Sequence, residues 1–263
     1  MPMSKSTITK VAGPLVKASG MSTAKMFEVV RVSKENLMGE VIELHGDEAA
    51  IQVYEETGGV GPGEPVELTG QTMSVELGPG LLQQIYDGVQ RPLELIEKDA
   101  KSPFISRGID VPGLDHSKKW EFKPVAKKGD EVNAGDILGE VEETTLILHK
   151  IMVPPGVSGK LKSIEKGSFT IDDTVAVIGD TKITMCQKWP IRVPRPVNSQ
   201  KEPNVPLVTG MRILDTLFPV MKGGAGAIPG PFGAGKTVTQ QSLAKYCDAQ
   251  VIIYIGCGER GNE

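Results

Sequence analysis

The sequence has no apolar run that approaches the ~20 residues of a membrane-spanning helix. Its first residues, Met1–Ser6, carry no apolar core of the kind that marks a secretory signal peptide. On these absences we expect a cytoplasmic protein without its own membrane span.

Cysteine and histidine are also scarce. Three cysteines (Cys186, Cys247 and Cys257) are widely spaced, and the three histidines are isolated. This pattern fits neither a disulfide framework nor a zinc site. Buried small side chains are the default interpretation for the cysteines. Because Cys257 lies close in sequence to the predicted phosphate site described below, a redox-sensitive thiol there remains an alternative.

Excess positive charge is absent as well. The 263 residues carry a formal net charge of −4, which argues against a broad basic surface for nucleic acid. Hydrophobic content of 39% and charged content of 24% are typical of a soluble globular protein. The length allows one large domain or two modest ones.

One stretch carries recognisable chemistry. It matches the phosphate-binding pattern G-x-x-x-x-G-K-[ST] at every fixed position: Gly230, Pro231, Phe232, Gly233, Ala234, Gly235, Lys236 and Thr237. The glycines let backbone N–H groups approach phosphate oxygens. The Lys236 ammonium can lie between the β- and γ-phosphates, and the Thr237 hydroxyl can ligate Mg²⁺.

The neighbouring residues favour this interpretation over a chance glycine-rich turn. Thr237–Tyr246 contains good helix formers without glycine or proline, and Val251–Ile255 is β-branched and aromatic, as in a buried strand. The preceding segment, Ala225–Ile228, is only a weak strand candidate. The order of loop, helix and strand predicts a nucleoside triphosphate site.

The N-terminal region, residues 1–70, predicts a small β-barrel, because many short strands alternate with glycine turns. The expected strands are Thr7–Val11, Leu15–Lys17, Phe27–Val32, Leu37–Leu44, Glu48–Val53 and Pro65–Leu68. Residues 71–115 are interpreted as the start of a larger domain, with a strand at Ser74–Leu77 and helical spacing at Leu81–Tyr86 and Leu93–Lys98.

Residues 116–189 form a separate β-rich segment, called here the inserted domain. We expect a β-hairpin over 128–141 and a second turn-linked pair over 153–161. The pattern resembles the flattened sandwich of biotinyl and lipoyl carrier domains. A carrier presents a modifiable lysine at the hairpin tip, and Glu142–Thr145 stand there instead. We therefore predict a structural role.

Residues 190–222 are rich in proline and predict extended chain. A short amphipathic helix is expected at Val208–Phe218, with its aspartate and threonines solvated or capping. Residues 190–263 are thus assigned to the nucleotide-binding domain.

The segments Ile228–Thr237 and Gly256–Glu263 together resemble the catalytic A subunit of archaeal and vacuolar-type rotary ATPases. The resemblance extends over the whole chain and includes the inserted domain, which the related F-type β subunit lacks. It implies a multidomain fold of α/β and β parts: an N-terminal six-stranded β-barrel, a RecA-like P-loop nucleotide domain, here incomplete, and an inserted β-rich bulge domain.

The resemblance also implies residue roles. Glu259 would orient the attacking water, Arg260 would stabilise the γ-phosphate, and Glu263 is a weaker candidate nearby. Lys236 would be catalytic as well as nucleotide-binding. Mg²⁺ with ATP or ADP is the implied cofactor.

The implied partners are a B subunit, in an alternating A3B3 hexamer, and the proteins of the central and peripheral stalks. No nucleic acid is implied. The location would be the cytoplasmic side of the cell membrane, as a peripheral protein, and the transported ion could be H⁺ or Na⁺. The family's catalytic chain continues past the position of Glu263, so we expect a truncated or split piece that turns over ATP poorly by itself.

Two alternatives remain open at the level of sequence. The chain could be an assembly or nucleotide-binding module without turnover. It could also belong to another hexameric RecA-like motor, for export or transcription termination, which would share the loop but would not need the inserted domain.

Overall fold

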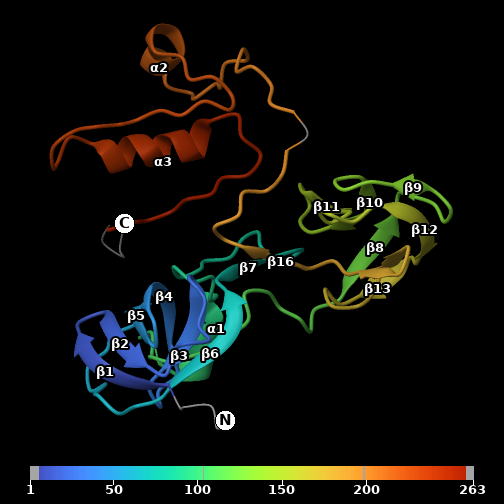
Figure 1. Ribbon diagram of the computed structural model, residues 1–263. Coiled ribbons are helices and arrows are strands. Elements are labelled where there is room, and N and C mark those ends of the chain that lie inside the picture. The colour runs from blue at the N-terminus through green and yellow to red at the C-terminus, as the bar shows by residue number, and fades with distance from the viewer. Residues whose placement is uncertain (1–5, 103, 198, 259–263) are drawn as a thin grey trace. The chain divides into compact units, whose positions relative to one another are not determined.

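The computed structural model describes residues 6–102, 104–197 and 199–258. The chain divides into two compact units, Met1–Pro196 and Val197–Glu263 (Figure 1). The first unit contains three successive parts: a six-stranded sheet, a short connecting region and the inserted domain.

The N-terminal part is an antiparallel six-stranded sheet, in the order β1-β2-β5-β4-β3-β6. Its strands are β1 (Thr7–Ala12), β2 (Leu15–Ser19), β3 (Glu28–Val32), β4 (Leu37–His45), β5 (Glu48–Val53) and β6 (Val66–Thr72). All six expected strands are present, within a few residues at their ends. Figure 1 shows them wrapping around a common centre.

The two edges of this sheet are joined by backbone hydrogen bonds. The Ile8 N–H donates to the Glu64 carbonyl at 2.8 Å, and the Val66 N–H donates to the Ser6 carbonyl at 2.9 Å. Aliphatic side chains at alternate strand positions fill the interior, and Val16, Val30 and Ile51 have no exposed surface. The result is a barrel with an aliphatic core, as the alternating pattern predicts.

The connecting region pairs with the segment that follows the inserted domain. β7 (Ser74–Leu77) lies antiparallel to β16 (Gln187–Pro190), so the two ends of the inserted domain are held together. The helix α1 (Leu93–Ala100) confirms the helix expected from 93. The helix expected at Leu81–Tyr86 is wrong, because these residues form turns. The Leu82 N–H there donates to the side chain of the distant Glu143 at 3.1 Å.

The inserted domain is a sandwich of two four-stranded sheets, in the orders β11-β10-β8-β13 and β15-β14-β12-β9. Its strands are β8 (Trp120–Pro124), β9 (Glu131–Val132), β10 (Ile137–Glu142), β11 (Leu148–Met152), β12 (Gly159–Ile164), β13 (Gly167–Phe169), β14 (Ala176–Ile178) and β15 (Thr181–Ile183). The sandwich architecture agrees with the expectation from sequence.

The pairing within the sandwich differs from the expected one. β9 pairs with β12 in one sheet, whereas β10 pairs with β8 and β11 in the other, so 128–141 is not a hairpin. The pair expected over 153–161 is also wrong, since only β12 begins there and its partners are β9 and β14. The chain crosses between sheets at these turns, and β10 contributes Val141 to one apolar cluster and Leu138 to the other.

The second unit contains α2 (Arg212–Leu217) and α3 (Lys236–Tyr246). α2 is shorter than the helix expected over 208–218, because Thr209 and Gly210 form a cap in which their N–H groups donate to Asp215. Val251–Ile255 does not form the expected buried strand: its side chains are 43–81% exposed. No strand of the described part of this unit lies beside it, and a strand requires a partner for its hydrogen bonds.

Candidate phosphate-binding site

The predicted phosphate-binding loop lies directly before α3, as the motif requires. Gly235 stands at the helix N-cap position with φ of 84°, and Gly233 has φ of 79°. Both values lie in the left-handed region that glycine adopts without a steric penalty. The loop can therefore turn sharply into the helix at these two residues.

The first turn of α3 leaves backbone N–H groups without helical acceptors, which is the usual condition of a helix N-terminus. The first intrahelical bond observed there is from the Thr239 N–H to the Gly235 carbonyl, at 3.0 Å. The N–H groups of Lys236, Thr237 and Val238 precede it. Such groups, with the positive end of the helix dipole, form a favourable place for an anion.

Lys236 is folded back over its own loop. Its Nζ donates to the carbonyl oxygens of Gly230, at 2.7 Å, and Pro231, at 2.8 Å. The ammonium thus spans the two ends of the loop and lies among oxygen acceptors. A phosphate bound in the loop would offer stronger, charged acceptors for the same donor.

Thr237 is available as a metal ligand. Among the described residues, the structure gives its hydroxyl no hydrogen-bond partner, whereas the hydroxyl of Thr239 donates to the Gly235 carbonyl at 3.0 Å. No group of three or more histidine, cysteine, aspartate or glutamate side chains suited to a metal occurs in the part of the chain that is described. One hydroxyl fits Mg²⁺, which commonly keeps several waters and takes other ligands from substrate phosphates.

The loop itself is exposed, and Phe232 at its centre is 93% exposed. A Cβ added at Gly233 or Gly235 would meet no atom within 4 Å, so the space over these glycines is open. At Gly230 an added Cβ would lie 3.1 Å from the Ala234 Cβ. The loop is thus compact internally and open on its outer side, where a phosphate chain would lie.

The C-terminal end of α3 is held by residues on both sides of α2 in the sequence. The Asp248 N–H donates to the Val208 carbonyl at 3.0 Å, and Lys222 forms an ion pair with the Asp248 carboxylate at 2.7 Å. The hydrogen bond from Lys222 lowers the pKa of Asp248. These contacts fix the end of α3 opposite the loop and leave the loop free to accept a ligand.

Three other predicted site residues, Glu259, Arg260 and Glu263, lie outside the described residues. Cys257, beside them, is exposed, and the three cysteines are free. No helix among the described residues has the length and apolar character that crossing a membrane requires.

Comparison with known families assigns three successive parts of the chain to one family. Residues 8–70 match the model described as "ATP synthase alpha/beta family, beta-barrel domain". Residues 111–192 match "ATPsynthase alpha/beta subunit barrel-sandwich domain". Residues 210–263 match "ATP synthase alpha/beta family, nucleotide-binding domain".

The curated relatives agree. The chain is 58% identical over 266 residues to the V-type ATP synthase alpha chain of Acetivibrio thermocellus, covering 99% of this chain and 45% of that protein. It is 59% identical over 260 residues to the A subunit of the A-type ATP synthase of Methanosarcina barkeri, covering 98% and 45%. The protein of Methanopyrus kandleri with the same description is 59% identical over 265 residues, with 98% and 45% covered.

The chain therefore spans about 45% of the length of these relatives. The similarity is continuous over the barrel, the inserted domain and the phosphate-binding loop, and all three family models describe parts of the same kind of protein. On these findings, the chain belongs to the ATP synthase alpha/beta family and resembles the A subunits of A-type synthases and the alpha chains of V-type synthases.

Proposed function

We propose that this chain is part of the catalytic subunit of an A/V-type ATP synthase or ATPase, in which ATP synthesis or hydrolysis is coupled to the transport of H⁺ or Na⁺ across a membrane. The observation that carries the proposal is the loop Gly230–Thr237, which turns into α3 at Gly235 and already directs Lys236 to oxygen acceptors. Relatives with more than half of their aligned residues identical bear the names of such synthases.

In this proposal the loop and the first turn of α3 hold the phosphates of ATP or ADP through backbone N–H groups. Lys236 exchanges the carbonyls of Gly230 and Pro231 for phosphate oxygens. The Thr237 hydroxyl ligates Mg²⁺, which, when bound, neutralises charge that develops on the phosphates.

Glu259 and Arg260 complete the proposed site. Glu259 orients the attacking water, and Arg260 stabilises charge on the γ-phosphate. Both follow the segment Val251–Ile255, whose composition suits a central strand of a nucleotide-binding sheet. Glu263 remains a secondary candidate in the same loop.

The assembly proposed is an alternating A3B3 hexamer with a B subunit, joined to the proteins of the central and peripheral stalks on the cytoplasmic side of the membrane. The proposed domain boundaries are 1–70 for the barrel, 71–115 for the start of the nucleotide-binding domain, 116–189 for the inserted domain and 190–263 for the P-loop region. The inserted domain serves packing and assembly in this proposal, because no modifiable lysine stands at its hairpin tip.

A second candidate is an assembly or nucleotide-binding module that does not turn over ATP alone. The exposed Val251–Ile255 favours it for the isolated chain, since the sheet that would position Glu259 is not assembled there. We therefore propose that the 263-residue chain binds nucleotide weakly and hydrolyses little or none.

The deciding experiment compares ATP binding and turnover in the assembled complex that contains this sequence. Lys236→Ala is expected to abolish binding or turnover, and Glu259→Gln to preserve binding while stopping hydrolysis. Lys245→Ala, which removes an exposed lysine from the other end of α3, is the matched control and should leave both unchanged. Normal turnover by Glu259→Gln would contradict the role given to Glu259. The second candidate would be favoured if the unmodified complex showed no turnover and the Lys236→Ala variant still assembled.

A further inference from the structure

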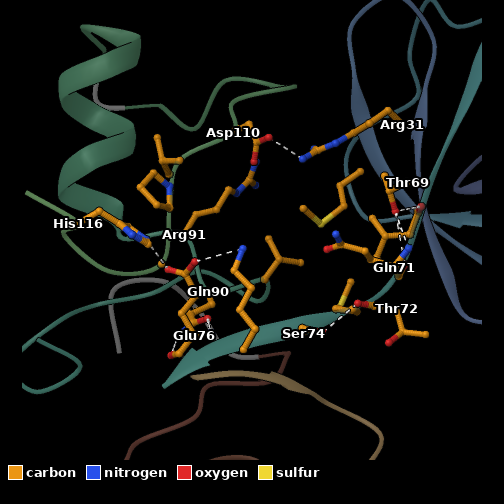
Figure 2. Close-up of a pocket in the computed structure, with 18 residues that line it drawn as sticks. Arg31, Thr69, Gln71, Thr72, Ser74, Glu76, Gln90, Arg91, Asp110 and His116 are labelled. Atoms are coloured by element: carbon orange, nitrogen blue, oxygen red, sulfur yellow. Dashed lines mark hydrogen bonds and ion pairs between the residues drawn. The ribbon is translucent and has the colours of Figure 1, made fainter. Parts of the chain in front are cut away.

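A cavity of about 580 Å³ lies in the first unit, between the barrel, the connecting region and β16 (Figure 2). Its walls come from β3, β4 and β6, from residues 73, 74, 76, 89–91, 110–113 and 116, and from Lys188 of β16. The volume is within the range of about 300–1,000 Å³ that small-molecule sites occupy. None of the lining residues belongs to the phosphate-binding loop.

Several hydrogen-bond donors in the cavity wall lack an acceptor among the described residues. Among the described residues, Arg31 has a partner only at Nη2, which contacts Asp110 at 2.6 Å and leaves Nε and Nη1 free. The side-chain amide of Gln71 has no hydrogen-bond partner among the described residues either. Within the described ranges, Lys188 has only a long ion pair, 3.8 Å from its Nζ to Glu76, and its side chain is 70% exposed, so it lies at the mouth of the cavity.

The carboxylates in the wall are already engaged. Glu76 accepts the Leu114 N–H at 3.1 Å and contacts His116 Nε2 at 3.1 Å. Asp110 is held by Arg31 but is 68% exposed, so it lies at the mouth of the cavity and not in its depth. The open hydrogen-bonding capacity of the cavity therefore consists mainly of cationic and amide donors.

Arg91 forms a fixed part of the wall. Its Nε donates to Asp87 at 2.7 Å, its Nη1 donates to the Ile109 carbonyl at 2.9 Å, and its side chain is only 8% exposed. This cation cannot move to meet a ligand, and its charge is offset by Asp87 and by Glu55, whose carboxylate lies 3.5 Å from Nη1, so Arg91 shapes the wall and the charge offered to a ligand comes from Arg31 and Lys188. Figure 2 shows Arg31, Arg91 and Gln71 around the same space.

Apolar side chains complete the lining, among them Val29, Met38 and Val89. An apolar wall opposite a few placed donors is the usual composition of a site for an organic anion, because the apolar wall accepts the body of the ligand and the donors orient its charged group.

We propose that this cavity binds a small organic anion with at least two anionic oxygens and an apolar portion, held by Arg31, Lys188 and Gln71. A phosphorylated and a carboxylated compound share this chemistry. Arg31 offers the planar fork that pairs with either group through two hydrogen bonds. The ligand displaces Asp110 from part of its contact with Arg31.

The two members of the Arg31–Asp110 pair provide a test that separates binding from structure. Arg31→Gln and Asp110→Asn break the same exposed ion pair, so any structural effect of its loss has the same sign in both variants and is small. An anion site predicts opposite effects on binding. Arg31→Gln removes a charged donor and should weaken binding about tenfold or more. Asp110→Asn removes a competing, repelling carboxylate and should tighten it.

The experiment uses the 263-residue chain carrying Lys236→Ala, so that binding at the phosphate-binding loop is removed. Pyrophosphate, citrate and AMP are titrated by calorimetry at low salt. Pyrophosphate and citrate distinguish phosphate from carboxylate ligands, and AMP tests the use of the apolar wall. Lys160→Gln, which changes a lysine of the inserted domain, is the matched control and should change the Kd less than about twofold.

The proposal is supported if at least one probe binds, weakens in Arg31→Gln and Lys188→Gln, and tightens in Asp110→Asn. It is overturned if none of the three probes binds, if Arg31→Gln and Asp110→Asn shift the Kd in the same direction, or if Lys160→Gln changes it as much as Arg31→Gln does. Far-UV circular dichroism without ligand checks that each variant is folded.

Discussion

Gly139 of β10 is the position where one added methyl group should most clearly destabilise the inserted domain. It is buried between β8 and β11 and pairs with Pro124 and Ile151. A Cβ at this position would overlap the ring of Phe122 and lie 2.8 Å from the Lys123 carbonyl oxygen. The Phe122 side chain is 1% exposed, and the carbonyl belongs to the neighbouring strand, so neither atom has room to withdraw.

The magnitude follows from two opposing effects. Replacing glycine by alanine at an unstrained position stabilises by about 0.4–1 kcal/mol, because the unfolded chain has less conformational freedom to lose. Overpacking a core costs about 1–3 kcal/mol. The φ of Gly139 is not in the left-handed region, so no backbone strain adds to the steric cost. Because the added Cβ overlaps the Phe122 ring, that cost lies at the upper end of its range, and subtracting the entropic gain leaves a loss of about 2 kcal/mol, or roughly 4–8 °C in Tm for a unit of this size.

The assay is thermal unfolding followed by intrinsic fluorescence. The chain has two tryptophans, and Trp120 lies in the apolar cluster beside Phe122, so the signal reports on this domain. Gly88→Ala is the control, because a Cβ there would meet no atom within 4 Å and φ is again outside the left-handed region. It should be neutral or slightly stabilising. If Gly139→Ala unfolds at the same temperature as Gly88→Ala, the close packing of β10 on Phe122 is not a constraint and the argument fails.

Three further outcomes are expected. The carboxylates of Asp172 and Glu76 accept hydrogen bonds from His116 and raise its pKa, that of Asp172 most. The stabilisation is complete below the unfolded pKa of 6.5 and is lost as pH rises through the folded pKa, so the unfolding temperature of His116→Gln should lose this dependence on pH. Burial, together with the hydrogen bond to Glu40, raises the pKa of Tyr54 to about 12. Ultraviolet titration of Glu40→Gln should therefore show the Tyr54 phenol ionising at lower pH than in the unmodified chain. An unchanged titration would contradict the contact. Burial raises the pKa of Cys186 to about 11, so a maleimide at a pH of about 7.5 should label the exposed Cys257 much faster than Cys186, as peptide mapping by mass spectrometry would reveal.

The parts of the fold that the sequence predicted well depend on local rules. The six barrel strands follow from β-branched residues at alternate positions between glycine turns, and Gly13 and Gly46 do adopt left-handed φ values of 59° and 61°. The start of α3 also follows locally, because Gly235 and Lys236 fix where the loop ends and the helix begins. In these places the nearest neighbours in sequence are sufficient to determine the structure.

The predictions that were wrong depend on partners that are distant in sequence. Residues 81–86 have helical spacing, yet the Gly80 and Leu82 N–H groups are held by Glu143, and that bond favours a turn. Val251–Ile255 has the composition of a strand, but composition supplies no neighbour to pair with. In the inserted domain the turns were recognisable, whereas the sheet to which each strand belongs was not, since β9 and β10 pair with strands that are not their neighbours in sequence.

The two candidate sites differ in the same way, since one is local in sequence and the other is not. The phosphate-binding loop is contiguous, so its motif could be recognised from sequence, and its turn into α3 at Gly235 agrees with the expectation, whereas the expected strand Val251–Ile255 does not form. The cavity in Figure 2 is formed by residues as far apart as Arg31, Gln71, Asp110 and Lys188, and no short pattern connects them. Only the folded chain brings these side chains together.

The two ends of the inserted domain lie side by side, so the insertion does not force the flanking chain apart. Its two ends are paired in β7 and β16, from Ser74 opposite Pro190 to Leu77 opposite Gln187. Directly after β16, Arg192 forms two hydrogen bonds with Glu40 of the barrel, at 2.6 and 3.2 Å, and the Glu40 side chain is only 1% exposed. The chain is thus returned to the barrel before it continues toward the phosphate-binding loop.

Closing a loop costs free energy that rises only slowly with its length, so an insertion between paired strands adds little conformational cost to the fold that carries it. The pairing of β7 with β16 and the contact of Arg192 with Glu40 therefore hold both ends of the inserted domain in place. The path of the chain that follows is fixed by these contacts rather than by the length of the insertion between them.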